Sequence, residues 1–202
     1  MTAIITGDII KSRKTKPENW LEDFKKMLQI FGEDTKDWEI YRGDEFQLKV
    51  KPEDALYTAF IIKAYLKAHS LNARIAIGIG KITYLNNKIS QSNGSAFVRS
   101  GEMLDKIKKN KLTLAIHIDN KEINNTINIM LILVTTFVDK WLPLAAKTVF
   151  VALKNKTLTQ EEIGNLLNIN QAAVSRRLQR ANYNEIIEVN NFYKEKIKTI
   201  VK

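Results

Sequence analysis

The sequence predicts an α+β protein with a ferredoxin-like N-terminal domain over residues 1–120 and an all-α domain over residues 121–202. In the first domain, strand-like and helix-like segments follow one another in the order β-α-β-β-α-β, with one more helix and strand, which is the ferredoxin-like plan. The second domain shows helical periodicity and helix-capping residues. Because 45% of the 202 residues are hydrophobic and 27% are charged, the chain can bury a core.

The chain opens with a short β-branched run at residues 3–6, closed by Asp8, and this pattern predicts a buried strand. A basic loop follows at residues 11–16. Apolar residues then recur at helical spacing between Pro17, which suits the first turn of a helix, and Gly32, which suits its end. The opening therefore predicts a strand, a basic loop and a helix.

A β-hairpin is predicted next, because strand-like runs at residues 38–41 and 46–50 flank a turn at Gly43. Pro52 suits the first turn of the second helix. The alternating run at residues 73–80 predicts the strand that follows this helix.

The remaining elements of the first domain are a helix that opens at residues 93–95 and a strand at residues 112–116. In the ferredoxin-like plan the first strand ends beside the turn of the central hairpin, so Asp8 and Asp44 are expected to lie close together. A helical connector over residues 121–141 leads into the second domain.

The most specific local pattern lies at residues 158–178 and predicts a helix-turn-helix. Thr159 and Glu162 form a capping box at the start of the first helix. Asn168 suits a turn that needs a positive φ, and Asn170 suits the N-cap of the second helix. This combination indicates DNA binding, and the alternative is a plain helical hairpin with a solvated basic face.

The second of these helices carries the predicted DNA-binding side chains. Five of them suit base edges or phosphates and are expected to face outward: Gln171, Ala172, Ser175, Arg176 and Gln179. Two more are expected to contact phosphates: Arg177 and Arg180. The net charge of +10 favours a polyanionic partner. The apolar tail at residues 184–201 is open to three interpretations: a wing, a packing helix or part of a dimer.

Acidic residues near the predicted hairpin are candidates for a two-metal nucleotide site. The predicted ligands are Asp8, Asp44 and the carbonyl of Ile9, since Mg²⁺ and Mn²⁺ bind carboxylate and carbonyl oxygens. The chain after Asp8 is expected to hold phosphates through Lys11, Ser12 and Arg13. If the strand begins there, Glu45 is expected on the opposite face from Asp44, as a supporting acid or an ion-pair partner. The alternative is a solvated turn.

Four segments carry a resemblance to a known family: Gly7-Asp8-Ile9-Ile10-Lys11-Ser12-Arg13, Arg42-Gly43-Asp44-Glu45-Phe46-Gln47, residues 75–80, and residues 94–101. Together they resemble the SatD family over most of the chain, including a C-terminal helix-turn-helix. The N-terminal part also resembles, more distantly, the class III nucleotide cyclase and GGDEF domains. That resemblance implies a palm-like core with Asp8 and Asp44 at the metal-binding positions and Gly43 at the turn glycine of the nucleotide site.

Three positions depart from the cyclase and GGDEF patterns. When the cyclase helix motif is registered on Gly94, Val98 stands at the position of the motif's asparagine and Glu102 at that of its arginine. The arginine would neutralise transition-state charge, which a glutamate would oppose. Arg42 replaces the first glycine of the GGDEF-type turn. The resemblance therefore implies metal and nucleotide binding more than turnover, and enzymatic activity is left open.

Two main functions are consistent with these patterns. The first is a SatD-like DNA-binding regulator whose N-terminal domain binds a nucleotide and a divalent metal, Mg²⁺ or Mn²⁺, and thereby shifts DNA affinity. The second is a nucleotidyl transferase or cyclase acting on an NTP with two metals held by Asp8 and Asp44. A weaker third interpretation is a structural dimerisation platform.

The expected partners are double-stranded DNA and a nucleotide, and a homodimer is compatible with both. No apolar run reaches the ~20 residues that cross a bilayer, so no membrane partner is expected. The lack of cysteine and of a signal-peptide pattern predicts a cytoplasmic location.

Overall fold

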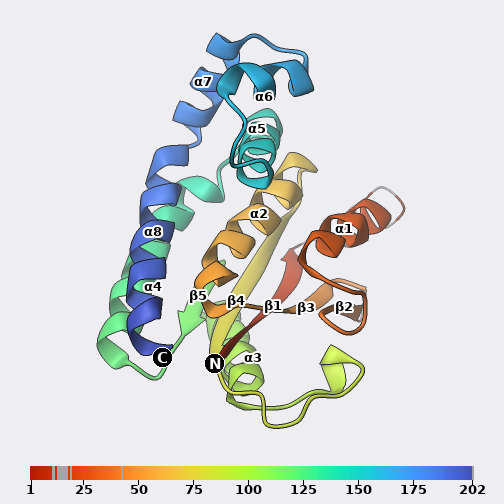
Figure 1. The fold of residues 1–202 in the computed structure, drawn as a ribbon, viewed down its shortest axis with the longest axis vertical. Coiled ribbons are helices and arrows are strands. Elements are labelled where there is room, and N and C mark those ends of the chain that lie inside the picture. Colours follow the sequence, from red (N-terminus) through yellow and green to blue (C-terminus); the bar gives the residue numbers. More distant parts are fainter. Residues whose placement is uncertain (11, 13–17, 19, 42, 202) are drawn as a thin grey trace.

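The computed structural model describes residues 1–10, 12, 18, 20–41 and 43–201, which form a five-stranded mixed sheet and eight α-helices (Figure 1). The α+β class predicted from the sequence is confirmed. The strands are β1 Thr2–Ile10, β2 Trp38–Tyr41, β3 Glu45–Val50, β4 Asn72–Gly80 and β5 Leu114–His117. The helices are α1 Leu21–Leu28, α2 Ala55–Ala68, α3 Ser95–Lys109, α4 Lys121–Val138, α5 Pro143–Lys154, α6 Gln160–Leu167, α7 Gln171–Arg180 and α8 Tyr183–Ile200.

The sheet has the strand order β2-β3-β1-β4-β5, with β1 in the centre. β1 is antiparallel to both of its neighbours, β3 and β4, and β2 is antiparallel to β3. Only the added edge strand β5 is parallel to its neighbour in this sheet, β4. Because β1 lies in the centre, helices can cover both of its faces, and its burial is almost continuous.

The first strand is longer than the sequence predicts: it continues past Asp8 to Ile10. An acid after a glycine is typical of a strand end, but here both neighbouring strands continue the hydrogen-bonded ladder. Asp8 pairs with Glu45 of β3 on one side, and Ile10 pairs with Asn72 of β4 on the other. Asp8 therefore lies inside a central strand, so its side chain has a fixed direction.

The two faces of the sheet are covered differently. Alternate residues of β1, such as Ile5 and Ile9, belong to the main hydrophobic core with Phe24 of α1 and Phe60 of α2. The other face packs against α3, and the close approach depends on Gly78, where a Cβ would lie 2.3 Å from the carbonyl oxygen of a residue in α3. This second face also carries the acidic side chain of Asp8, by alternation along β1.

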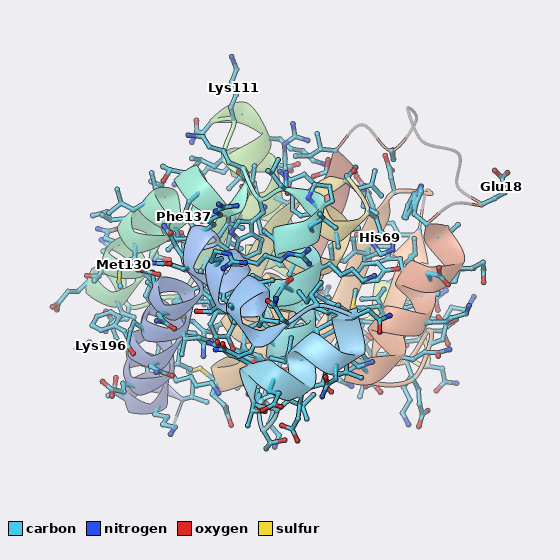
Figure 2. All side chains as sticks on the ribbon, turned by 90° about the horizontal axis from the view of Figure 1, so that it is seen from above. Glu18, His69, Lys111, Met130, Phe137 and Lys196 are labelled. Carbon is cyan, nitrogen blue, oxygen red and sulfur yellow. The ribbon has the colours of Figure 1, made fainter. Side chains whose placement is uncertain are left out.

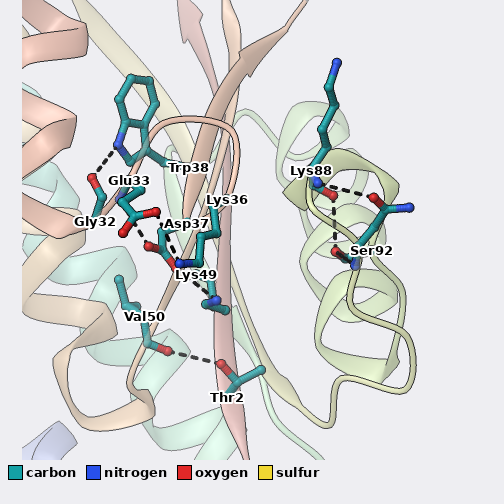
Figure 3. Close-up of polar contacts among 11 residues, drawn as sticks. Thr2, Gly32, Glu33, Lys36, Asp37, Trp38, Lys49, Val50, Lys88 and Ser92 are labelled. Atoms are coloured by element: carbon teal, nitrogen blue, oxygen red, sulfur yellow. Dashed lines mark hydrogen bonds and ion pairs between the residues drawn. The ribbon is translucent and has the colours of Figure 1, made fainter.

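The β2–β3 hairpin is anchored at its base, as Figure 3 shows. The indole of Trp38 donates a 3.0 Å hydrogen bond to the Gly32 carbonyl, and Trp38 is almost fully buried. Lys49 of β3 forms a 2.9 Å ion pair with Asp37, just before β2. These contacts fix the start of the hairpin and hence the place of its tip.

The C-terminal half is helical and packs on the N-terminal half. Figure 1 shows α8 running beside α4, while α6 and α7 lie at the end of the molecule opposite the two chain termini. The hydroxyl of Tyr57 in α2 donates to the Leu153 carbonyl of α5 at 2.7 Å, and that of Tyr193 in α8 donates to the Pro52 carbonyl at 2.5 Å. One hydrophobic cluster extends from Ala3 to Ile197, so the two predicted domains share a core.

The tail after α7 is a packing helix rather than a wing, because α8 buries Ile186, Tyr193 and Ile197. The connector helix α4 ends at Val138, three residues before the predicted end, and β5 begins at Leu114, two residues after its predicted start. In the part of the chain that is described, none of the helices has the length and hydropathy of a bilayer-crossing segment.

Candidate functional site

The tip of the β2–β3 hairpin lies beside β1. The Ile9 N–H donates a 2.9 Å hydrogen bond to the Asp44 carbonyl, and Asp8 stands opposite Glu45 in the ladder. Gly43, next to Asp44, has a φ of +82°, a left-handed conformation that glycine adopts without strain. The structure therefore brings together the three predicted metal ligands, Asp8, Ile9 and Asp44, at the level of the backbone.

The two carboxylate oxygens of Asp8 have different surroundings. Oδ2 accepts a 3.0 Å hydrogen bond and ion pair from Nη1 of Arg74, which stands opposite Asp8 on β4. Oδ1 is buried and has no hydrogen-bond partner among the described residues. A buried carboxylate oxygen without a partner is unfavourable, so this oxygen is suited to bind a cation or a water molecule.

Asp44 is tied to the segment that follows β1. The hydroxyl of Ser12 donates a 2.9 Å hydrogen bond to Oδ2 of Asp44, so the predicted phosphate-binding segment is in contact with the hairpin tip. Lys11 and Arg13, the two predicted basic phosphate contacts, lie outside the described residues, as does Arg42.

Polar groups continue across the sheet face that packs against α3. Because directly opposed residues of antiparallel strands share a face, Glu45, Asp8 and Arg74 form a charged row across β3, β1 and β4. Lys108 of α3 adds a 3.4 Å ion pair with Glu45. Glu45 therefore has an ion-pair partner, one of the two roles expected for it.

The donor set fits a hard divalent cation. Asp8, Asp44 and the Ile9 carbonyl offer only oxygen atoms, and Mg²⁺ is commonly held by one or two carboxylates together with phosphate oxygens and water. The unpartnered Oδ1 of Asp8 supports this fit. Among the described residues no group of three or more acidic or histidine side chains is placed to hold a metal ion, so phosphate and water would have to complete the coordination.

Val98 and Glu102, the positions that depart from the cyclase pattern, are both exposed on α3. Arg99, between them, is engaged elsewhere: its guanidinium donates to the Ile79 carbonyl and to the Asp119 carboxylate. Neither Val98 nor Glu102 can supply the positive charge that the arginine of the cyclase motif would bring, and the guanidinium of Arg99 is bound to other groups.

The α6–α7 pair has the caps that the sequence predicts. The Glu162 N–H donates to Oγ1 of Thr159 at 3.2 Å, and the Thr159 N–H donates to Oε2 of Glu162 at 2.7 Å. The Thr159 N–H and, at 2.9 Å, the Thr159 hydroxyl both donate to the Glu162 carboxylate, and these two hydrogen bonds lower the pKa of Glu162 below its usual value. Asn168 closes α6 in the left-handed conformation, with φ 53° and ψ 46°, and Asn170 caps α7 by accepting from a backbone N–H at 2.8 Å.

The turn between α6 and α7 is compact because of Gly164. A Cβ at this position would lie 2.6 Å from the Ile169 carbonyl oxygen, which is too close for any other residue without a backbone shift. Ile163, Val174 and Leu178 are buried between the helices and α5. The two helices are therefore held at a fixed angle by packing as well as by their caps.

The predicted DNA-binding side chains of α7 do not all share one outward surface. Five of them are exposed: Gln171, Ala172, Arg176, Gln179 and Arg180. Ser175 and Arg177 are only half-exposed. Ser175 and Gln179 line a pocket of about 440 Å³ between α5, α6, α7 and α8, so they face a concave surface.

A buried polar cluster was missed in the sequence. Lys63 of α2 is fully buried, forms a 2.9 Å ion pair with Asp139 after α4, and donates to Oδ1 of Asn72 at 3.1 Å. Asp139 also accepts a 2.6 Å hydrogen bond from Thr113. The signal in the sequence was a single lysine within the otherwise uncharged run at residues 55–66.

The fold and these sites define the class of protein: an α+β chain with an acid-lined hairpin beside its central strand and a helical half that ends in two capped helices and α8. The chain belongs to the SatD family, whose family model matches residues 2–197. Comparison with curated proteins and with solved structures gave no match.

Proposed function

We propose that this SatD-family protein is a DNA-binding regulator whose N-terminal half binds a nucleotide together with Mg²⁺ or Mn²⁺. The observation that carries the proposal is the α6–α7 pair, in which Arg176 and Arg180 are exposed and form no ion pair within the described residues. Arginines presented on the second helix of such a pair suit phosphates and guanine edges.

Three features support a helix-turn-helix. The capping box at Thr159, the left-handed Asn168 and the cap at Asn170 give two short helices joined by a tight turn, as in that motif. The net charge of +10 supports a polyanionic partner. Gln171 and Ala172, at the start of α7, are exposed where recognition helices contact bases.

The N-terminal proposal is supported by topology and by one unpartnered atom. The antiparallel order β2-β3-β1-β4 is the strand order that a ferredoxin-like core has, and it places the hairpin tip beside β1. Asp8 offers a buried Oδ1 that lacks a partner in the described chain, and Asp44 is in contact with Ser12. When bound, the metal would neutralise phosphate charge, and Asp8, Asp44 and the Ile9 carbonyl would hold it.

The shared core supports communication between the two halves. α5 packs against α2 and leads directly to α6, so a change at the sheet could alter the placement of α7. Regulation requires that the nucleotide bind two arrangements of the protein with different affinity. DNA affinity measured with and without nucleotide and Mg²⁺ is therefore the functional readout.

The DNA-binding half is tested with a labelled 30-bp duplex titrated at several salt concentrations. The logarithm of affinity should fall linearly with the logarithm of salt concentration, because DNA binding releases counterions. The double variant Arg176→Ala/Arg180→Ala should bind more weakly and reduce the salt slope by about two, one for each lost phosphate contact.

The matched control is Lys196→Ala/Lys198→Ala, which removes the same charge from the exposed far end of α8, opposite α7 (Figure 1). This control should bind nearly as the native protein does. Equal losses in the two double variants would show that only net charge matters and would end the proposal for α7.

The nucleotide half is tested by thermal unfolding with each NTP, with Mg²⁺ or Mn²⁺, and with both. A ligand that binds only the folded chain raises Tm. Asp8→Asn and Asp44→Asn should abolish the shift that NTP and metal produce together, whereas Asp105→Asn, an exposed acid on α3, should keep it. Shifts that persist in both site variants would place the ligand elsewhere.

The second candidate function is a nucleotidyl transferase or cyclase, and the two acidic side chains predicted as metal ligands favour it. In that reaction a hydroxyl of the NTP attacks an α-phosphate, and the metals stabilise the developing charge. Incubation with each NTP and Mn²⁺, followed by chromatography, should reveal a new product if this function holds. This function would be contradicted if Asp44→Asn formed product at the native rate, or if the native protein formed no product.

A further inference from the structure

The outward face of α4 carries an apolar stripe. Ile129, Ile132 and Leu133 keep 61%, 44% and 63% of their surface exposed, while the opposite face of the helix is buried. Figure 2 shows α4, which carries the labelled Met130 and Phe137, on the side of the molecule away from α1. Exposed apolar clusters of this kind mark association surfaces.

Exposed charges lie at both ends of the stripe: Glu122 beside Lys121 at the N-terminal end of α4, and Lys140 after its C-terminal end. Residues 123–138 contain no charged side chain, in a chain whose net charge is +10. Glu122 lies on the same helical face as Ile129, by the 3.6-residue period, and Lys140 lies in the turn two residues after the end of α4; both are exposed. Neither forms an ion pair in the part of the chain that the structure describes.

The order of these residues matches an antiparallel pairing with an identical helix. Glu122 and Lys140 are equally far in sequence from Leu131, and so are Ile129 and Leu133. If a two-fold axis crosses the exposed face of α4 at the height of the buried Leu131, Glu122 lies near Lys140 of the second copy and Ile129 lies near Leu133 of the second copy. One axis therefore creates two ion pairs and two apolar pairs from a single stripe.

We propose that the α4 stripe, Ile129, Ile132 and Leu133, together with Glu122 and Lys140 at its two ends, is the surface on which a second copy of this chain docks, with the two α4 helices antiparallel. Charge supports a second copy rather than a different partner, because the acid at one end of the stripe is complementary to the base at its other end. The uncharged middle also lets two strongly basic chains approach with little repulsion.

The first experiment is sedimentation equilibrium of the full chain up to about 100 µM, a range in which small interfaces associate. The native protein should approach twice the mass of one chain. Leu133→Glu should remain monomeric, whereas Leu85→Glu, at an exposed leucine outside the stripe, should dimerise as the native chain does. A monomeric native protein, or a dimer that Leu133→Glu leaves intact, would overturn the proposal.

Charge reversal tests the direction of the pairing. Glu122→Lys should raise the dimer dissociation constant about tenfold, because each of two ion pairs becomes a repulsive pair. The double variant Glu122→Lys/Lys140→Glu restores opposite charges across the axis and should return the dissociation constant to its native value. A double variant weaker than the single one would contradict the antiparallel arrangement.

Cysteine cross-linking tests the register, and the native chain contains no cysteine. Ile132→Cys places two thiols about 3 Å apart along the helix axis in the proposed dimer, whereas Asn125→Cys places them about 18 Å apart. Under mild oxidation, Ile132→Cys should give a disulfide-linked dimer and Asn125→Cys should not. Equal cross-linking of the two variants, or none by Ile132→Cys, would overturn the register.

Discussion

Lys63 of α2 and Asp139, the residue that follows α4, form a 2.9 Å ion pair in which the lysine side chain is fully buried and the aspartate side chain keeps 26% of its surface exposed. Burial lowers the pKa of Lys63 despite the neighbouring aspartate. Burial raises the pKa of Asp139, but the charge of Lys63 and three hydrogen bonds outweigh it, so the net pKa lies below the usual value. The pair joins the sheet-bearing half to the helical half.

Removing the aspartate of this pair should lower the free energy of unfolding more than removing the lysine does. Asp139→Asn leaves a fully buried ammonium without a counter-charge and should destabilise the protein by about 3–5 kcal/mol. Lys63→Met leaves an aspartate that is partly exposed and keeps its Thr113 hydrogen bond, so the loss should be smaller, about 1–3 kcal/mol.

Urea unfolding of both variants and of the double variant Lys63→Met/Asp139→Asn gives the coupling free energy. The double variant should lose less than the two single variants together, because it leaves no unpaired charge. Additive losses would show that Lys63 and Asp139 do not depend on each other.

The same carboxylate predicts a pH dependence. Because the folded pKa of Asp139 lies below the unfolded value of 3.8, its contribution is fully present above that value and is lost as the pH falls through the folded pKa. As the pH falls below 3.8, the native chain should therefore lose more of its free energy of unfolding than Asp139→Asn does. Asp37 and Glu162, whose pKa values are also lowered, are common to both proteins and cancel in the comparison. Parallel pH profiles would contradict this role.

The sequence predicted most elements of the fold because periodicity and capping are local properties. Gly43, Asn168 and Asn170 each stand where the backbone needs them, and the predicted hairpin and helices formed there. The end of β1 was misjudged, because its continuation past Asp8 depends on pairing with β3 and β4. That pairing is a long-range property with no local signal.

The candidate sites also combine features that the sequence could predict with features that depend on long-range packing. The proximity of Asp8 and Asp44 followed from the strand order, which could be predicted from the sequence. The ion pair between Asp8 and Arg74, however, depends on the register of β1 against β4. Likewise, the helical period alone made Ser175 outward-facing, whereas the position of α8 turns it toward a pocket. Details set by the packing of distant elements could not be predicted.

The close approach at Gly164 predicts a strong effect of a single methyl group. Gly164→Ala would place a Cβ 2.6 Å from the Ile169 carbonyl oxygen, so the α6–α7 turn must shift, although alanine favours helix. We expect a lower Tm and weaker duplex binding. Gly101→Ala in α3 is the control, because a Cβ there meets no atom within 4 Å, and it should be neutral or slightly stabilising. Native behaviour of Gly164→Ala would show that the turn can relax at no cost.

The two carboxylate oxygens of Asp8 have different surroundings, and this difference gives a test of the metal site that does not require enzymatic activity. In Arg74→Gln the carboxylate loses its 3.0 Å cationic partner, so the metal-free protein should be less stable by about 1–3 kcal/mol. Mn²⁺ no longer competes with the guanidinium for Asp8, and the rise in Tm on adding Mn²⁺ should exceed that of the native chain. Lys108→Gln, which removes a cation from Glu45 in the same charged row, should lack this larger response. If the Mn²⁺ response of Arg74→Gln equals that of the native protein, Asp8 is not a metal ligand and its pairing with Arg74 serves stability alone.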